Sequence, residues 1–249
     1  MRILLVNDDG IFAPGIRALY EVLQGVCDVI VAAPAMEQSG MAQAITVHDT
    51  IRVDDYKMSP EGLSGWKIYG TPADCVKLAV EALLDEKPDL IVSGINKGSN
   101  LGTDILYSGT VGAAMEAYIH DIPAIAVSLD AQSTIQFSQA AALIRDQIFT
   151  WFQEEAHPFL YNVNFPQVLK GNMSTFVFTK LGVRKYINAF NCELDVEQHR
   201  VYQMGGEISD GENDDVTDIF AVKQGYISVT PLQLDLTSYK TLEDKLEAD

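Results

Sequence analysis

Short apolar runs alternate with segments of helical spacing through the first 165 residues of the chain. The apolar runs at 3–6, 29–33, 90–92 and 124–128 are bounded by polar residues, a pattern typical of strands buried on both faces of a parallel sheet. Segments of helical spacing occupy 14–23, 71–84, 111–119 and 135–152. This alternation predicts an α/β fold with a doubly wound, mostly parallel sheet.

Local signals support two of these helices in particular. Pro14 suits a first helical position and Gly25 suits a helix stop. Thr71, Pro72 and Asp74 together form a helix-start pattern, with a hydroxyl cap, a proline at the first position and an acid at the third. We therefore expect helices to begin at residues 14 and 72.

The rest of the chain is richer in strands. Residues 43–70 predict antiparallel strands around 51–53 and 66–69, and further strands are expected near 175–180, 200–204 and 225–229. We interpret the chain as a single α/β domain of residues 1–249. Its core comprises about 1–180 and 220–235, a β-rich oligomerisation arm projects at about 185–219, and a C-terminal helix lies at about 239–247.

The strong negative charge of the chain makes some classes of binding partner unfavourable. There are 35 acidic and 17 basic residues, giving a formal net charge of −18, so the surface repels nucleic-acid polymers but does not exclude a small phosphate ester. Nine carboxylates and one arginine lie between Glu193 and Asp218, which we interpret as a solvated arm. Without an apolar run of membrane-span length or a secretory signal, we expect no membrane partner and a cytoplasmic location.

Three polar loops follow three of the predicted parallel strands, and the carboxyl ends of such strands open on one edge of a sheet. The loops contain Asn7-Asp8-Asp9-Gly10, then Ser39-Gly40, and then the glycine-rich stretch 93–108. Gly10 permits the bend that lets both aspartates converge, because glycine tolerates positive φ. Oxygen ligands of this kind suit Mg²⁺, Mn²⁺ or Ca²⁺. For residues 7–10 alone, an ordinary turn with two solvated aspartates is the alternative.

An anion site is expected beside this metal site. Ser108, Gly109 and Thr110 stand at a predicted helix N-terminus, where free amides and the helix dipole favour negative charge. The chain lacks a Gly-x-Gly-x-x-Gly loop after its first strand, a Gly-Lys-Ser/Thr P-loop and a Gly-x-Ser-x-Gly elbow. A metal next to backbone amides and hydroxyls predicts a phosphoryl site.

Several segments, in order along nearly the whole chain, resemble the survival protein E (SurE) family of nucleotidases. They are residues 7–10, 38–40, 69–76, 93–102, 107–116 and 225–232. The resemblance implies a divalent-metal-dependent phosphomonoesterase that hydrolyses nucleoside 5′- and 3′-monophosphates. It also implies a Rossmann-like core with a C-terminal swapped arm, in homodimers or homotetramers. At 195–198, where many members carry a basic Asp-Pro-Arg-Gly-like segment, this chain has Asp-Val-Glu-Gln, which leaves the arm contacts open.

The resemblance also assigns roles to residues. One divalent ion per subunit, Mg²⁺ or Mn²⁺ (with Ca²⁺ as a substitute in a crystal), would be held by Asp8, Asp9, Ser39 and Asn96. The phosphate would be bound around Gly40, Asn100, Ser108, Gly109 and Thr110.

We expect Asp8 or Asp9 to act as the base on water, with His48 as the histidine to test as general acid. Two alternatives from other classes remain: a non-catalytic nucleotide-binding protein, and a metal-dependent nucleotidyl or glycosyl transferase. Turnover of monophosphates separates the first from a nucleotidase, and the need for an activated donor separates the second.

Overall fold

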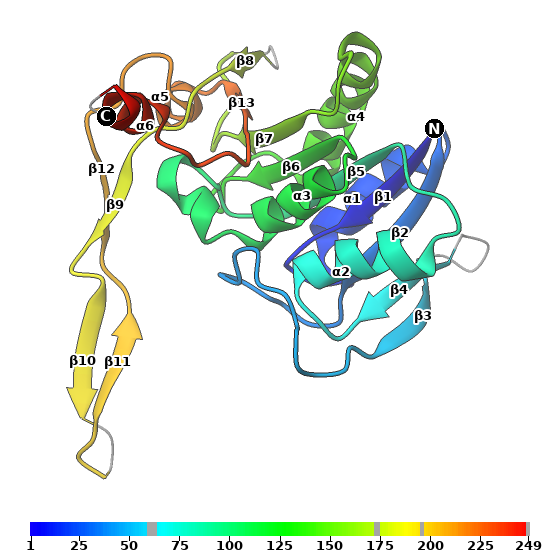
Figure 1. Ribbon diagram of the computed structural model, residues 1–249, viewed down its shortest axis with the longest axis horizontal. Helices are drawn as coiled ribbons and strands as arrows, with labels where there is room; N and C mark the ends of the chain where they lie inside the picture. Colours follow the sequence, from blue (N-terminus) through cyan, green and yellow to red (C-terminus); the bar gives the residue numbers. More distant parts are fainter. Residues whose placement is uncertain (59–63, 172–174, 195–196, 248–249) are drawn as a thin grey trace.

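A single large sheet organises the body of the protein. The computed structural model describes residues 1–58, 64–171, 175–194 and 197–247, and within them the sheet has nine strands (Figure 1). Six parallel strands form its centre: β1 (Arg2–Val6), β2 (Asp28–Pro34), β4 (Ser64–Ile68), β5 (Leu90–Lys97), β6 (Ala124–Leu129) and β7 (Leu160–Phe165). The flanking strands are β3 (Val53–Lys57), β13 (Ile227–Pro231) and β8 (Phe176–Phe178), in the order β3-β4-β2-β1-β5-β6-β7-β13-β8. The predicted mostly parallel α/β sheet is confirmed.

Helices cover both faces of this sheet. The helices are α1 (Pro14–Leu23), α2 (Pro72–Leu78) with a π-helical continuation (Ala79–Leu83), η2 (a 3₁₀ helix, Gly102–Leu106), α3 (Gly109–Ile119), α4 (Phe137–Glu154), α5 (Asp218–Lys223) and α6 (Tyr239–Leu246). One apolar layer joins α1 and α4 to the sheet, and a second joins α2 and α3 to the opposite face. Thr71 forms the predicted capping box with Asp74 at the start of α2.

Alternation along β1 decides which layer each side chain enters. Ile3 and Leu5 pack in the α1/α4 layer, whereas Leu4 and Val6 pack in the α2/α3 layer, and all four are completely buried. Successive side chains of a strand point to opposite faces. Asp8 and Asp9 therefore emerge from the end of β1 toward different layers.

Two predictions need correction, one at the centre of the sheet and one at its edge. The stretch 93–97, predicted as the start of a loop, continues β5 to Lys97, because Ser93 pairs with Ala126 and Asn96 with Ser128. Pairing to a neighbouring strand outweighs the weak strand propensity of glycine and asparagine here. The strand expected around 51–53 begins only at Val53, and the partner strand β4 also pairs in parallel with β2.

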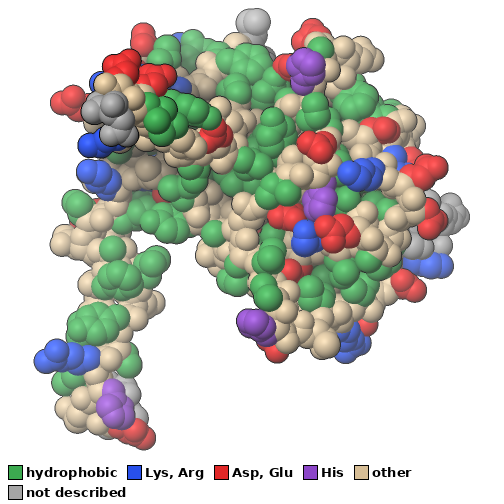
Figure 2. Space-filling model, viewed as in Figure 1, with side chains coloured by type: hydrophobic (Ala, Val, Ile, Leu, Met, Phe, Trp, Pro, Cys, Tyr) green, Lys and Arg blue, Asp and Glu red, His purple; other side chains and the backbone are tan. Residues whose placement is uncertain are grey.

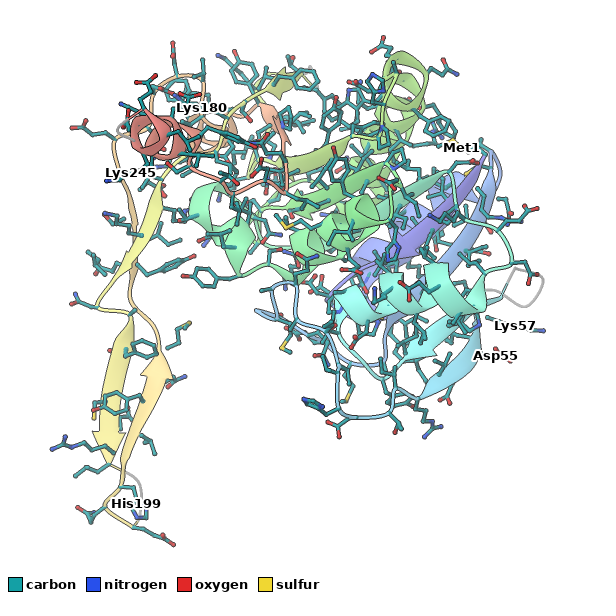
Figure 3. All side chains as sticks on the ribbon, in the orientation of Figure 1. Met1, Asp55, Lys57, Lys180, His199 and Lys245 are labelled. Atoms are coloured by element: carbon teal, nitrogen blue, oxygen red, sulfur yellow. The ribbon has the colours of Figure 1, made fainter. Side chains whose placement is uncertain are left out.

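A long two-stranded arm leaves the body of the molecule (Figure 1). It consists of β9 (Arg184–Ile187), β10 (Phe190–Leu194), β11 (Arg200–Met204) and β12 (Glu207–Asp210), with β9 antiparallel to β12 and β10 antiparallel to β11. Figure 3 shows His199 at the far end of the arm. Residues 195–196, part of the segment that departs from the family pattern, lie outside the described residues.

The acidic tract is less solvated than its sequence indicates. Asp218 is completely buried, and its carboxylate accepts hydrogen bonds from the amides of Gly102 and Gly182, both at 2.8 Å. Asp210 forms ion pairs with Arg184 at 2.8 Å and with Lys223 at 2.6 Å. These contacts fasten the base of the arm to the body.

Candidate functional site

The three polar loops predicted to converge do meet at one edge of the sheet. β1 lies between β2 and β5, with all three parallel, so their carboxyl ends are neighbours. The amide of Gln38 donates to the Asp8 carbonyl at 2.8 Å, and the amide of Lys97 donates to Asp9 Oδ2 at 3.1 Å. Gly10 has a φ of 96°, the positive value that the bend after the aspartates requires.

Asp8 is a buried carboxylate held by the start of α3. Its Oδ1 accepts from the hydroxyl of Thr110 at 2.5 Å, and its Oδ2 accepts from the Thr110 amide at 3.1 Å. Burial raises the pKa of Asp8 to about 6, against the lowering effect of the Thr110 hydroxyl and with a further rise from the charge of Asp9. Thr110 is itself fully buried, so Asp8 is fixed in position.

Asp9 is more accessible and faces the other layer. Burial raises its pKa, the amide of Lys97 opposes that rise, and the charge of Glu37 adds to it. Its Oδ2 accepts the Lys97 amide, whereas Asp8 has both oxygens bonded. Asp9 is therefore the aspartate better placed to interact with a group in solution.

Ser39 and Gly40 lie in an exposed turn after β2. The Ser39 hydroxyl donates to Glu37 Oε1 at 2.7 Å, and Gly40 has a φ of 73°. The loop is anchored just beyond this turn, where the Ala42 amide donates to the Tyr107 carbonyl at 3.0 Å. The turn thus approaches the start of α3 from the β2 side.

Two buried carboxylates anchor the same loop: Glu116, which the sequence analysis did not single out, and Asp74, which it assigned only to the start of a helix. Glu116, on α3, accepts from Gln43 Nε2 at 3.2 Å and lies 3.5 Å from Lys77 Nζ. Asp74, on α2, accepts from both the amide and the hydroxyl of Thr46, at 2.8 and 2.6 Å. The loop that carries Ser39 is therefore fixed to both helices of the α2/α3 layer.

Asn96 and Asn100 have different surroundings. Asn96 Nδ2 donates to the Gly98 carbonyl at 2.8 Å, which leaves its Oδ1 as the atom suited to a cation. Asn100 is buried, its Nδ2 donates to Ser128 Oγ at 2.8 Å, and its amide donates to Asn164 Oδ1 at 2.7 Å. These bonds attach the Asn100 side chain to the end of β6 and its backbone amide to the end of β7, so in this structure Asn100 holds the loop in place.

The start of α3 is packed directly against Asp8. Ser108 caps the helix by accepting from the Val111 amide at 3.1 Å. A Cβ on Gly109 would lie 2.9 Å from Asp8 Cβ, so only glycine allows this approach. Because the Thr110 amide and hydroxyl are both bonded to Asp8, the N-terminal dipole of α3 and the Gly109 amide are what remain for an anion.

The donor atoms at this edge fit a hard divalent cation. Asp8 and Asp9 contribute carboxylate oxygens, Asn96 an amide oxygen and Ser39 a hydroxyl, the ligand types that Mg²⁺ and Mn²⁺ prefer. Asn7 directly precedes the two aspartates, and its Oδ1 is buried without a hydrogen-bond partner among the described residues. Among the same residues, no group of three or more His, Cys, Asp or Glu side chains is arranged to hold a metal ion. The candidate ligand set therefore needs Ser39 and Asn96 in addition to the two aspartates.

The histidines do not join this site in the part of the chain that the structure describes. His48 is exposed on the loop between β2 and β3. His120 lies at the C-terminal end of α3, with its Nε2 3.4 Å from Glu116 and 3.6 Å from Glu81. Among the described residues, no helix is long and apolar enough to cross a membrane.

Comparison with known proteins gives consistent results. The family model described as "Survival protein SurE" matches residues 3–188. The protein named 5′-nucleotidase SurE from Heliobacterium modesticaldum is 44% identical over 98% of this chain and 90% of its own length, and its namesake from Pelotomaculum thermopropionicum is 46% identical over 98% and 93%. The crystal structure of the SurE protein from Aquifex aeolicus superimposes with a TM-score of 0.83 at 38% identity, covering 100% of both chains.

Proposed function

Because the chain belongs to the survival protein SurE family, we propose that it is a metal-dependent nucleotidase. The reaction is hydrolysis of nucleoside 5′- and 3′-monophosphates to nucleoside and phosphate. The observation that carries this proposal is the pair of adjacent aspartates at the end of β1, both with raised pKa values, of which Asp8 is bonded to the N-terminus of α3. Two desolvated carboxylates side by side, next to a helix start, suit a cation and a phosphoryl group together.

The metal ion is proposed to be Mg²⁺ or Mn²⁺, one per subunit, held by Asp8, Asp9, Ser39 and Asn96. When bound, the ion supplies positive charge to the phosphate oxygens. Phosphate-monoester hydrolysis is very slow without a catalyst, so most of the protein's work is positioning and charge stabilisation. Thr110 contributes by holding Asp8, and Gly109 by letting α3 approach the site.

Asp9 is the proposed base that orients and deprotonates the attacking water. Asp8 suits this role less, because both of its oxygens accept hydrogen bonds from Thr110. The same bonds argue against a covalent phosphate on Asp8, since a carboxylate so engaged is a poor nucleophile.

Phosphate release tests the proposal. Adenosine 5′- and 3′-monophosphates are incubated with the protein and Mn²⁺ or Mg²⁺, with and without EDTA. We expect metal-dependent release that EDTA abolishes and that Asp9→Asn lowers at least 100-fold. Asp55→Asn, which removes an exposed carboxylate at the far edge of the sheet, is the control and should match the wild type (Figure 3). No release by folded, metal-loaded protein would exclude a nucleotidase.

The two alternatives have separate signatures in the same assay. A non-catalytic binding protein would bind the nucleotide and release no phosphate. A nucleotidyl or glycosyl transferase would leave monophosphates intact and consume an activated donor. The relatives named 5′-nucleotidase favour neither of them.

The arm supports a further part of the proposal, a homodimer or homotetramer. Figure 2 shows hydrophobic side chains along the arm. The exposed apolar residues of its strands are Tyr186, Ile187, Phe190, Leu194, Val201, Tyr202, Met204 and Ile208. An isolated two-stranded ribbon is marginally stable, and exposed apolar surface of this kind marks an interface. Light scattering should give a dimer or tetramer for the wild type and a smaller species for Phe190→Ser/Tyr202→Ser.

We also propose a cytoplasmic location, which fractionation would test.

A further inference from the structure

A cleft opens beside Asp9 on the α1/α4 side of the sheet. It has a volume of about 320 Å³, at the lower end of the range for small-molecule sites. Its lining comprises Asp9, Phe12, Ala13, Pro14, Lys97 and Phe137. The cleft therefore has a charged end, which includes one of the proposed metal ligands, and an otherwise apolar lining.

The geometry of the cleft depends on how closely α1 approaches β5. A Cβ on Gly15 would lie only 1.9 Å from the Ile95 carbonyl oxygen, so the first turn of α1 sits directly on the strand that carries Asn96 and Lys97. Pro14 precedes this contact and forms one wall of the cleft. The wall is thus fixed by backbone packing next to the candidate metal site.

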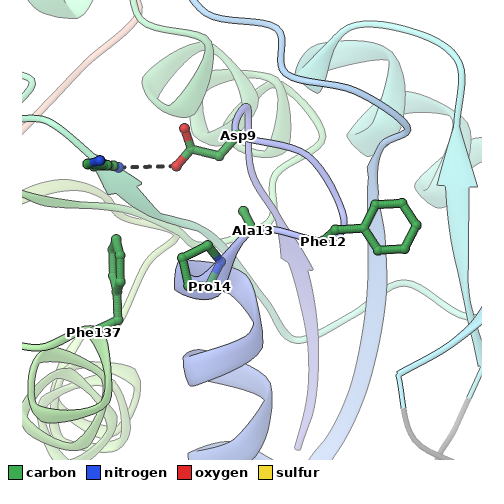
Figure 4. Close-up of a pocket in the computed structure, with 6 residues that line it drawn as sticks. Asp9, Phe12, Ala13, Pro14 and Phe137 are labelled. Atoms are coloured by element: carbon green, nitrogen blue, oxygen red, sulfur yellow. Dashed lines mark hydrogen bonds between the residues drawn. The ribbon is translucent and has the colours of Figure 1, made fainter.

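Phe137 forms the opposite wall. It is the first residue of α4, half-buried, and packed against the α1/α4 core layer. In Figure 4 the Phe137 ring and Pro14 stand on either side of a space that leads to Asp9, whereas the Phe12 ring is directed away from it. Phe12 instead meets Tyr56 edge to face, with ring centroids 5.5 Å apart.

A flat heterocycle is the ligand chemistry that such a slot accepts. An aromatic face gives a base a stacking surface, and this contact is worth about 1–3 kcal/mol per base when tested by alanine substitution. The phosphate at the other end of the same molecule would then lie at Asp9 and Lys97, within reach of the metal. The cleft is continuous with the candidate site because Asp9 belongs to both.

We propose that this cleft is the nucleoside subsite, with the base stacked on Phe137 and its other face toward Pro14. The assignment rests on the proposed nucleotidase function. It makes Phe137 the residue that distinguishes a nucleotide from a phosphate ester without a base.

Two substrates that share a 5′ phosphate ester test this assignment. Adenosine 5′-monophosphate carries the base and ribose 5-phosphate does not. We expect Phe137→Ala to raise KM for the nucleotide about tenfold, with kcat little changed, because tenfold corresponds to 1.4 kcal/mol of lost stacking. KM for ribose 5-phosphate should not change. Phe137→Tyr, which keeps a ring, should stay within about twofold of the wild type for both substrates.

Two further variants separate stacking from folding. Phe149→Ala removes another half-buried phenylalanine of α4 that packs on the core and does not line the cleft, and it should leave the ratio of the two KM values unchanged. Phe137→Leu keeps apolar volume without a ring and should resemble Phe137→Ala. Equal effects of Phe137→Ala on both substrates, or no effect on either, would overturn the assignment.

Direct binding of adenosine, measured by calorimetry, distinguishes failure of this subsite from failure of the proposed function. If the wild type releases no phosphate from either ester, the nucleotidase proposal fails. Adenosine binding that is weakened about tenfold by Phe137→Ala, but not by Phe149→Ala, would still support a nucleoside subsite. The nucleoside subsite would be refuted if the wild type did not bind adenosine at millimolar concentration, or if Phe137→Ala and Phe149→Ala bound it equally well.

Discussion

Gly112→Ala should disable the site without touching a proposed ligand. Gly112 is in α3, where alanine is worth about 1 kcal/mol more than glycine in helix propensity. Its new Cβ, however, would lie 2.2 Å from the Ala42 carbonyl oxygen and 3.0 Å from Gln43 Cα. Ordinary contact begins near 3.4 Å, so the helix and the loop must separate by about 1 Å.

We expect the loop that carries Ser39 to move, rather than α3. The helix is held by its packing in the α2/α3 layer, whereas the Ser39 turn is exposed. Shifting Ala42 strains its bond to Tyr107 and the contact between Gln43 and Glu116. A misplacement of about 1 Å can cost about 100-fold in rate. We expect kcat/KM to fall by about that factor and metal affinity to fall with it.

The assay is phosphate release from adenosine 5′-monophosphate, with the metal titrated by calorimetry. Thermal unfolding of Gly112→Ala checks that the variant is folded. Gly25→Ala is the matched control, because its Cβ would meet nothing within 4 Å. A folded Gly112→Ala protein with kcat/KM within threefold of the wild type would refute the reasoning that the loop positions Ser39 for catalysis.

Three further predictions concern stability. Thr110→Val removes the hydroxyl that donates to the buried Asp8 carboxylate and should lower the free energy of unfolding, measured in urea without metal, by about 2 kcal/mol; an unchanged value would contradict a charged Asp8. Trp151→Ala empties a buried site between Tyr161 and Phe176 and should cost about 3–5 kcal/mol in the same titration, so a loss below 1 kcal/mol would contradict the packing described. Burial alone would raise the pKa of Asp210, but hydrogen bonds from Arg184 and Lys223 lower it below its ordinary 3.8, so its stabilising contribution is present above about pH 4 and is lost as pH falls further. Asp210→Asn should flatten that acid limb of the stability profile, and an identical limb would show that the ion pairs do not contribute.

The convergence of the three loops could be predicted because short stretches of sequence are enough to identify buried parallel strands and the loops that follow them. Continuous apolar runs identify strands covered on both faces, and the carboxyl ends of parallel strands share an edge. β7 was not predicted because Asn162 and Asn164 interrupt its apolar run. Both are completely buried and bond to the Asn100 carbonyl, a tertiary contact more than 60 positions away. Sequence patterns carry no signal for such pairs.

The same limit applies to individual roles in the candidate site. The family resemblance leads us to propose Thr110 and Asn100 as phosphate-binding residues, whereas their hydrogen-bond partners, Asp8 and Ser128, depend on the folded arrangement. Glu116 was not singled out because one glutamate on a helix usually indicates a solvated face. Its contact with Gln43, 73 positions away, appears only in three dimensions.

The alternation at the end of β1 gives the two aspartates separate neighbourhoods. Asp8 belongs to the α3 side, where its carboxylate is bonded to the fully buried Thr110 and a substitution disturbs the core. Asp9 belongs to the α1/α4 side, where Pro14 and Phe137 border an open cleft. Mutations that accumulate over evolution can therefore reshape the cleft on one face of the sheet while the anchorage of Asp8 on the other stays intact. Variation at Pro14 or Phe137 can thus alter the proposed contacts with a base while the hydrogen bonds that hold Asp8 are kept.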